Sequence, residues 1–174
     1  MNIRIGKENE FDLLDDLLKQ AATRLKNKGS EQWSHILEDA EQETLHFRLN
    51  NQEVLLFEEN EQIAGMCYLY EEPNEWDADL WKHPKEDNHY YLHKVVISDA
   101  FVGQHYGEKM LLHLINWLEK QGGKRILLDC KADVTYLNTF YQKVGFQFIG
   151  SVKQADVPTL PSDFNLYEYE LNNN

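Results

Sequence analysis

Hydrophobic residues recur along this chain with two different periods, and each period predicts one kind of secondary structure. Between Phe11 and Leu25 the apolar positions lie three or four residues apart, which is typical of a helix with one buried face. The same spacing predicts helices over 106–121 and 134–144, and a second, broken helical stretch over 33–49. Short β-branched or alternating runs predict strands at 2–5, 54–57, 63–70, 90–97, 126–130, 146–152 and 164–171.

One long segment, residues 71–85, has neither period. It contains Pro73 and Pro84 and is rich in acidic residues, so we predict a loop. The resulting order of elements, β-α-α-β-β-β-α-β-α-β-β, predicts an α/β fold (of the α+β kind) with a mixed sheet and helices on both faces. A chain of 174 residues is expected to form one domain over 1–174.

The charge of the chain restricts its partners. A net charge of −13 argues against nucleic acid and anionic membranes. Between Lys94 and Lys143, however, seven basic residues outnumber five acidic ones. This asymmetry has two interpretations: an acidic surface that only keeps the protein in solution, or a less acidic part for an anionic cofactor beside an acidic part for a cationic substrate.

Three further features bear on the compartment of the protein. No apolar run approaches the length of a membrane span, and the first residues, MNIRIGKENE, are too polar for a signal peptide. Cys67 and Cys130 lie far apart without metal-type spacing, so we expect free thiols in a reducing cytoplasm, with a disulfide as the alternative. We expect no metal site.

The segment Leu92–Gly107, LHKVVISDAFVGQHYG, joins a predicted strand to a predicted helix. Its β-branched run Val95–Ile97 is expected to be a buried strand. The N–H groups of a first helical turn lack internal partners and carry partial positive charge, so the loop before this helix is a candidate anion site. Many α/β folds contain such a junction.

Three segments together resemble the GNAT superfamily of acyl-CoA-dependent N-acyltransferases. The segment LHKVVISDAFVGQHYGEKMLLHLINWLEKQGGKRILLDC is similar to the cofactor motif of the family in strand, loop, helix and next strand. The segment LNTFYQKVGF is similar to its tyrosine-bearing helix, and KNKGSEQWSHI resembles a loop between the first two helices of one bacterial branch. The resemblance covers nearly the whole chain and implies a mostly antiparallel sheet of about seven strands.

The resemblance implies acetyl-CoA as the co-substrate. Its pantetheine arm would run along the backbone of Val95, Val96 and Ile97, in the manner of an added strand. The other cofactor-binding residues that the resemblance implies are Val102, Gly103, Gln104, His105, Tyr106, Gly107, Glu108, Lys109 and Asn138.

Three positions depart from the pattern of the family: Val102 stands where Gln or Arg is usual, His105 where Gly is usual, and Val134 where many members have Asn. We therefore expect cofactor binding that survives but is weakened.

The resemblance also suggests the catalytic residues. Tyr141 matches the general acid of the family, although its spacing fits a core aromatic as well. Asp129 aligns with a base found in some relatives, or is a carboxylate that caps the end of its strand. His93 has a suitable intrinsic pKa, but a hydrogen-bonded core histidine is the simpler interpretation. Glu71 or Glu72 could act through water, and some members use no dedicated base.

The acceptor is less constrained than the cofactor. Tryptophan and acidic residues can hold a cation, so the candidate substrate-binding residues are Gln32, Trp33, Glu71, Trp76 and His93, together with the rest of the acidic run Glu71–Asp79. A solvated acidic loop with a packed tryptophan is the alternative.

The sequence thus predicts an N-acetyltransferase that moves an acetyl group from acetyl-CoA to the primary amine of a small, cationic molecule. A non-catalytic acyl-CoA-binding module with a degenerate pyrophosphate loop is the alternative. A domain that binds another nucleotide would be a third, but neither a Walker loop nor GxGxxG is present. Family analogy leaves a homodimer open.

Overall fold

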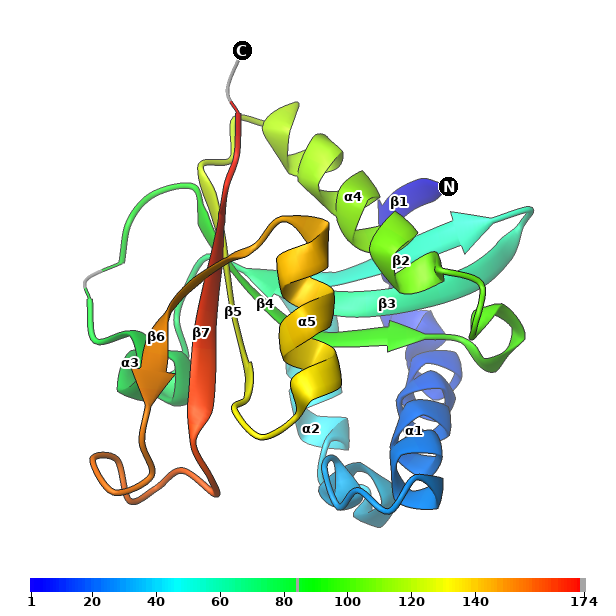
Figure 1. Ribbon diagram of the computed structural model, residues 1–174. Helices are drawn as coiled ribbons and strands as arrows, with labels where there is room; N and C mark the ends of the chain where they lie inside the picture. Colours follow the sequence, from blue (N-terminus) through cyan, green and yellow to red (C-terminus); the bar gives the residue numbers. More distant parts are fainter. Residues whose placement is uncertain (84, 173–174) are drawn as a thin grey trace. The chain divides into compact units, whose positions relative to one another are not determined.

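The computed structural model describes residues 1–83 and 85–172. Its seven strands form one mixed sheet in the order β1-β2-β3-β4-β5-β7-β6. β4 and β5 pair in parallel, whereas β1 with β2, β2 with β3, β5 with β7 and β6 with β7 pair antiparallel. The predicted mixed, mostly antiparallel sheet of about seven strands with accompanying helices is confirmed (Figure 1).

Contacts divide the chain into two compact units. The first contains Met1–Leu69 and Lys94–His113, and the second contains Tyr70–His93 and the chain from Leu114 onward. Two elements contribute to both units: β4 (His89–Ile97) and α4 (Tyr106–Glu119). A single domain over 1–174 stays a prediction.

The first unit combines an antiparallel hairpin with helices near the N-terminus. β1 (Asn2–Ile5) pairs with β2 (Val54–Glu59), which turns back into β3 (Gln62–Tyr70). α1 (Phe11–Asn27) contacts both a 3-10 helix (Ser34–Glu38) and α2 (Gln42–Asn50). The apolar positions of α1 that predicted a helix are its buried face: Leu14, Leu17, Leu18, Ala21 and Ala22.

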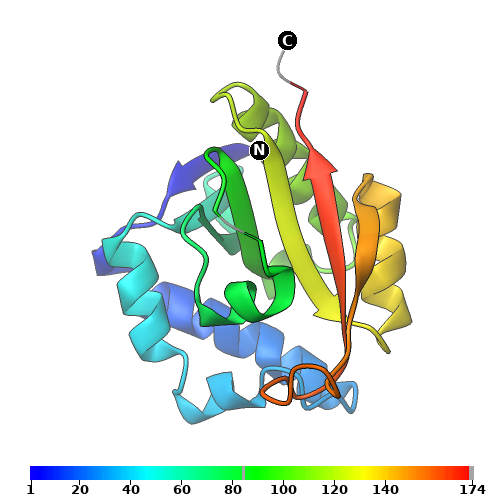
Figure 2. The same cartoon turned by 90° about the vertical axis from the view of Figure 1, so that its left-hand side faces the viewer.

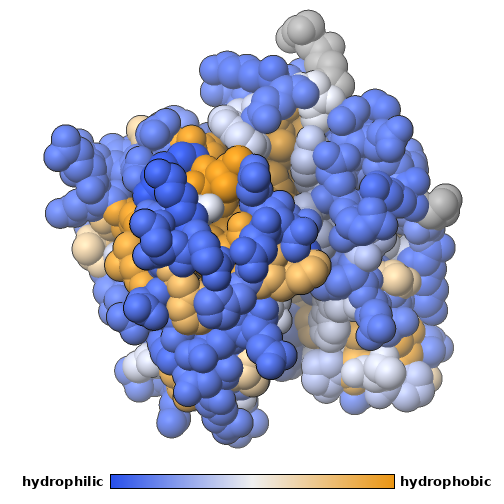
Figure 3. Space-filling model, turned by 180° about the vertical axis from the view of Figure 1, so that it is seen from behind, coloured by the Kyte–Doolittle hydropathy of each residue, from blue (hydrophilic) through white to orange (hydrophobic). Residues whose placement is uncertain are grey.

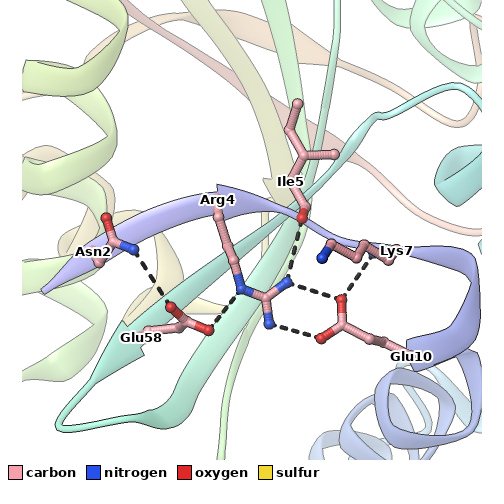
Figure 4. A network of polar contacts seen from close by, with 6 residues as sticks. All are labelled: Asn2, Arg4, Ile5, Lys7, Glu10 and Glu58. Carbon is pink, nitrogen blue, oxygen red and sulfur yellow. Dashed lines mark hydrogen bonds and ion pairs between the residues drawn. The ribbon is translucent and has the colours of Figure 1, made fainter.

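An arginine ties β1 to both of its neighbours in this unit. Arg4 Nε lies 2.7 Å from Glu58 Oε1 on β2, and Arg4 Nη2 lies 2.7 Å from Glu10 Oε1 in a short 3-10 helix (Glu8–Glu10) before α1 (Figure 4). The other Glu10 oxygen accepts from the Lys7 N–H, 2.9 Å away. The hydrogen bond with Arg4 lowers the pKa of Glu10.

The second unit is built on β5 (Arg125–Lys131), β7 (Phe164–Glu170) and β6 (Gln147–Val152), in which β7 lies between the other two (Figure 2). α5 (Thr135–Val144) contacts both β5 and β6. A short helix, α3 (Glu75–Trp81), contributes Leu80 to a cluster with Val157, Leu160, Phe164 and Leu166.

The predicted loop over 71–85 is wrong in part, because it contains α3. Seven residues are too few to display a hydrophobic period. The helix is instead started by a capping box, in which Asn74 and Asp77 exchange side-chain and backbone hydrogen bonds. The pattern Asn-x-x-Asp after Pro73 was the local signal for it. Pro84 lies outside the described residues.

The expectation that Val95–Ile97 form a buried strand also needs correction. Only Val96 is buried, whereas Val95 and Ile97 are half-buried. The β-branched run identified the strand, but it could not distinguish a strand covered on both faces from one with a partly open face.

Both cysteines are buried free thiols, as predicted. Burial raises the pKa of Cys67 far above its usual range and that of Cys130 to about 12, so both side chains stay protonated. Across the described part of the chain, no helix is long and apolar enough to cross a membrane. The face seen in Figure 3 is mostly hydrophilic, with hydrophobic residues visible between polar ones.

Candidate active site

The junction between β4 and α4 is the candidate cofactor site of the first unit. Its strand end is fixed to α1, because Arg24 Nη2 donates to the carbonyl oxygen of Ile97 at 2.6 Å while Arg24 Nη1 pairs with Asp99. The Ile97 carbonyl therefore already has a protein donor. Val95, Val96 and Ile97 stay predicted as the backbone beside the pantetheine arm.

The loop of this junction, residues 102–105, is exposed and contains two left-handed residues. Gly103 has a φ of 80°, and a Cβ built on it meets no atom within 4 Å. His105 has a φ of 58°, a conformation that glycine adopts more readily than other residues. His105 thus takes a glycine-like backbone conformation at the position where the family usually has Gly, with its side chain exposed.

The first turn of α4 adds N–H groups without intrahelical partners. Tyr106 packs its ring against Phe101 at 4.7 Å between centroids. Lys109 Nζ lies 5.1 Å from the centroid of the Tyr106 ring and 2.9 Å from Glu59 Oε1. Lys109 lowers the pKa of Glu59. The loop and helix start therefore fit an anionic group through backbone N–H groups, whereas the Lys109 charge is balanced by Glu59.

In the second unit, the register of β4 and β5 brings two predicted site residues to one face. The parallel pairing is recorded up to Tyr91 opposite Leu127. His93 and Asp129 each follow this pair by two residues, and side chains two apart share a face of the sheet. Among the described residues, β5 pairs with β4 only as far as Leu127. From Leu128 onward it pairs with β7 alone.

α3 completes this face with Trp76 and Asp77. Asp77 is fully buried, and its Oδ1 lies 2.7 Å from His93 Nε2. Trp76 Nε1 donates to Asp129 Oδ1 at 3.2 Å. The ring of Tyr70 stacks on the His93 imidazole with centroids 5.4 Å apart and planes 4° from parallel. Trp76, His93 and Asp129, named separately from the sequence, thus lie together, with Asp77 of the acidic run beside them.

We call Asp77, His93 and Asp129 the carboxylate–histidine cluster. One ligand atom from each of these side chains lies within 4.8 Å of the others. Two carboxylates and an imidazole at this spacing can bind a cation or accept a proton from one. Asp77 was not singled out from the acidic run, because the sequence predicted a loop there and only the tertiary structure places its carboxylate against His93.

α5 carries the remaining predicted residues of the second unit, on the opposite face of the β5–β7 pair. Asn138 Oδ1 accepts from the Tyr167 hydroxyl and from Asn165 Nδ2, both at 2.7 Å. Its Nδ2 donates to the Val134 carbonyl at 2.9 Å and to the Lys131 carbonyl at 3.0 Å. The Asn138 amide therefore joins α5 to β5 and β7, and its role towards the cofactor stays a prediction.

Tyr141, the predicted general acid, is half-buried on the same helix. Its ring contacts Phe146 at 5.9 Å and Tyr167 at 6.2 Å between centroids. Tyr167 lies opposite Leu128 on β5, one residue before Asp129. Because successive side chains alternate between faces, Tyr141 and Asp129 approach this part of β5 from opposite sides.

The other predicted substrate-binding residues, Glu71, Gln32 and Trp33, have contacts of their own. Glu71 Oε2 accepts from the Asn88 N–H at 3.2 Å, and Glu71 is not part of the carboxylate–histidine cluster. Gln32 and Trp33 belong to the first unit, where Lys94 Nζ lies 5.2 Å from the centroid of the Trp33 ring and the Gln32 N–H donates to Ser30 Oγ at 3.2 Å.

Comparison with known proteins identifies the family. Residues 14–146 match the model of the acetyltransferase (GNAT) family. The chain is 32% identical over 162 residues to a Bacillus subtilis (strain 168) protein named uncharacterized N-acetyltransferase YesJ, covering 93% of this chain and 86% of that one.

Solved structures agree with this match. A GNAT-family acetyltransferase from Listeria monocytogenes 4b F2365 is 31% identical, with a TM-score of 0.79 and coverage of 98% of this chain and 94% of that one. One from Streptococcus agalactiae 2603 shares the fold at 21% identity, with a TM-score of 0.78 and coverage of 98% and 95%. The family uses acetyl-CoA as co-substrate, and its members act on small molecules or on other acceptors. The chain belongs to the GNAT family and is an acyl-CoA-dependent N-acetyltransferase.

Proposed function

We propose that this enzyme transfers the acetyl group of acetyl-CoA to a primary amine of a small cationic acceptor, by direct attack of the amine on the thioester. The observation that carries the proposal is the contact of Trp76 with Asp129 beside the buried Asp77. Carboxylates attract an ammonium group by charge, and a neighbouring tryptophan ring adds a favourable cation–π contact. These groups fit a substrate with a positive charge better than a neutral one.

The cofactor would be held mainly by backbone atoms. We assign the pantetheine arm to the backbone of Val95, Val96 and Ile97, and the pyrophosphate to the loop 102–105 with the first turn of α4. The left-handed conformations of Gly103 and His105, both of which are exposed, support this assignment. When bound, acetyl-CoA supplies an acyl group activated as a thioester.

Tyr141 is the proposed acid. A thiolate leaves more easily when it gains a proton, and a phenol is a suitable donor. Half-burial of Tyr141 between Phe146 and Tyr167 would hold its ring in one orientation. The alternative of a non-catalytic binding module is disfavoured, because the family model and the relatives indicate an enzyme.

The test compares acceptors of equal length that differ in one charge. Release of free thiol from acetyl-CoA is followed with 1,5-diaminopentane and with 5-amino-1-pentanol. We expect a higher kcat/KM for the diamine, because only this acceptor keeps a second ammonium group for the carboxylates. Equal values for both acceptors would remove the preference for cationic substrates, and no thiol release with any amine would remove the proposed reaction.

Two variants test whether Asp129 causes the preference for a cationic acceptor. We expect Asp129→Asn to raise KM for the diamine by about tenfold while changing KM for the amino alcohol much less, since about 1.4 kcal/mol of charge attraction corresponds to that factor. The control is Asp156→Asn, an exposed aspartate on the loop between β6 and β7, which should change neither. An equal effect of Asp129→Asn on both acceptors would contradict the assignment.

A further inference from the structure

We propose that His93 accepts the proton of the attacking amine and that Asp77 is the positioning residue that holds its imidazole. This inference rests on the proposed function, because it concerns the proton that an amine must lose before it can attack. It assigns Asp77 a role that its place in a helix-capping box does not suggest.

Each of the two oxygens of the Asp77 carboxylate has a hydrogen-bond partner. Oδ1 lies 2.7 Å from His93 Nε2, and Oδ2 accepts from the Asn74 N–H at 3.1 Å. A buried carboxylate is stable only when its oxygens receive hydrogen bonds, so Asp77 favours the form of His93 with its proton on Nε2. In this tautomer Nδ1 keeps its lone pair and can accept a proton. No hydrogen-bond partner of Nδ1 is found among the described residues.

One further contact and one difference in exposure support a functional histidine. The stacked ring of Tyr70 restricts rotation of the imidazole. His93 retains 20% of its side-chain exposure whereas Asp77 has none, so substrate can approach the histidine but not the aspartate. A histidine with a purely structural role has no need of this access.

Asp129 supplies a place for the second ammonium group of the acceptor. It lies on the same face as His93 and within the 4.8 Å cluster, and its Oδ1 is oriented by the Trp76 N–H. When Asp129 holds the second ammonium group of a short diamine, the attacking amine at the other end would therefore lie close to the imidazole. The titratable side chains that face His93 within the second unit are Asp77 on α3, Asp129 on β5 and Tyr70 at the end of β3.

The protons and electrons of the step balance. The ammonium group gives one proton to His93 Nδ1, and its freed electron pair forms the C–N bond to the thioester carbonyl. The C–S bond then breaks, and the sulfur keeps the electron pair and takes a proton from Tyr141. The second N–H proton leaves the tetrahedral intermediate and replaces the one given by Tyr141, while His93 returns its proton to solvent.

The test separates proton transfer from folding by means of two acceptors. One is 1,3-diaminopropane, and the other is 2,2-difluoro-1,3-diaminopropane, whose fluorines lower the amine pKa so that it needs less help from a base. We expect His93→Gln to lower kcat/KM for the first acceptor at neutral pH by about 100-fold, the usual size of general-base catalysis, and for the second by far less. Raising the pH should restore the variant, because the amine then loses its proton unaided.

Asp77→Asn tests the positioning role. It should lower kcat more than it raises KM and shift the acidic limb of the pH–rate profile. The control His113→Gln, a residue of α4 that is not part of the carboxylate–histidine cluster, should leave the profile unchanged. Melting temperatures show whether each variant folds, and His93→Gln decides the question if Asp77→Asn does not fold. Equal losses with both acceptors at every pH would overturn the inference.

Two other outcomes separate this inference from alternatives. Loss of wild-type activity on chelation, restored by a divalent metal, would assign the carboxylate–histidine cluster to a metal instead and overturn it. A wild-type enzyme that acetylates neither diamine nor any monoamine would remove the proposed function itself, and the inference with it.

Discussion

Asp77 Oδ1 lies 2.7 Å from His93 Nε2, and the two residues come from a short helix and from the central strand of the sheet. This contact joins a residue whose local role is to start α3 to a residue at the point where β4 and β5 stop pairing. One carboxylate thereby fixes both the helix start and the imidazole. Four predictions concern the surroundings of the two candidate sites.

Tyr141→Phe removes the proposed acid without changing the volume of the ring. We expect kcat to fall by about 100-fold or more while the affinity for acetyl-CoA stays nearly constant, because the hydroxyl acts on the leaving sulfur rather than in binding. Steady-state kinetics and a cofactor titration measure the two effects. Tyr136→Phe, on the exposed side of the same helix, is the matched control. An unchanged kcat for Tyr141→Phe would assign the ring to packing alone.

Gly65→Ala should destabilise the first unit. A Cβ at Gly65 would lie 2.3 Å from the Val96 carbonyl oxygen and 2.7 Å from Met110 Sδ, and the former is a backbone atom that cannot rotate away. We expect a loss of about 1–3 kcal/mol in the free energy of unfolding, the usual cost of overpacking, and a raised KM for acetyl-CoA as Val96 is displaced. Gly150→Ala, where an added Cβ meets no atom within 4 Å, is the control. Equal stability of the two variants would contradict this account.

Asn138→Ala should destabilise the second unit. The substitution leaves the buried Tyr167 hydroxyl without its acceptor. It also removes the side-chain donor to the Val134 and Lys131 carbonyls, which keep their backbone donors. We expect a loss of about 1–3 kcal/mol in denaturant unfolding, which is the usual cost of one unsatisfied buried polar group. Asn116→Ala, at an exposed position of α4, should cost far less. A loss of cofactor affinity with full stability would instead favour the direct cofactor contact.

The stability of the protein should fall as the pH is lowered below the usual range of histidine titration. Burial lowers the pKa of His89, and the nearby Arg125 and Lys124 act in the same direction against Glu86. The unfolded chain then binds this proton more readily than the folded protein, so the contribution is complete above about pH 6.5 and declines below it. Burial lowers the pKa of His113 with the same sign.

Denaturant unfolding at several pH values measures this effect. We expect His89→Gln to have a smaller decline in stability between neutral and mildly acidic pH than the wild-type protein. Above about pH 7.5 the two curves should differ by a constant offset, which reports any loss of packing and serves as the internal control. Parallel curves across the whole range would mean that His89 does not contribute.

Most of the fold could be predicted from the sequence, because its signals are local. A hydrophobic period is visible within about 11–18 residues, and the long helices α1, α4 and α5 and all seven strands have such periods or β-branched runs. The family motif was likewise recognisable, since the loop before α4 and the tyrosine-bearing helix are continuous segments. α3 was missed because its seven residues are shorter than this window.

The sequence by itself thus determined the elements, the family and several single candidates: Trp76, His93, Asp129 and Tyr141. Only the tertiary structure decided which of them meet. The register of β4 against β5 sets His93 beside Asp129, and α3 brings Asp77 and Trp76 to the same face. A one-residue change of register would move a side chain to the other face, and nothing in the local spacing of residues specifies that register.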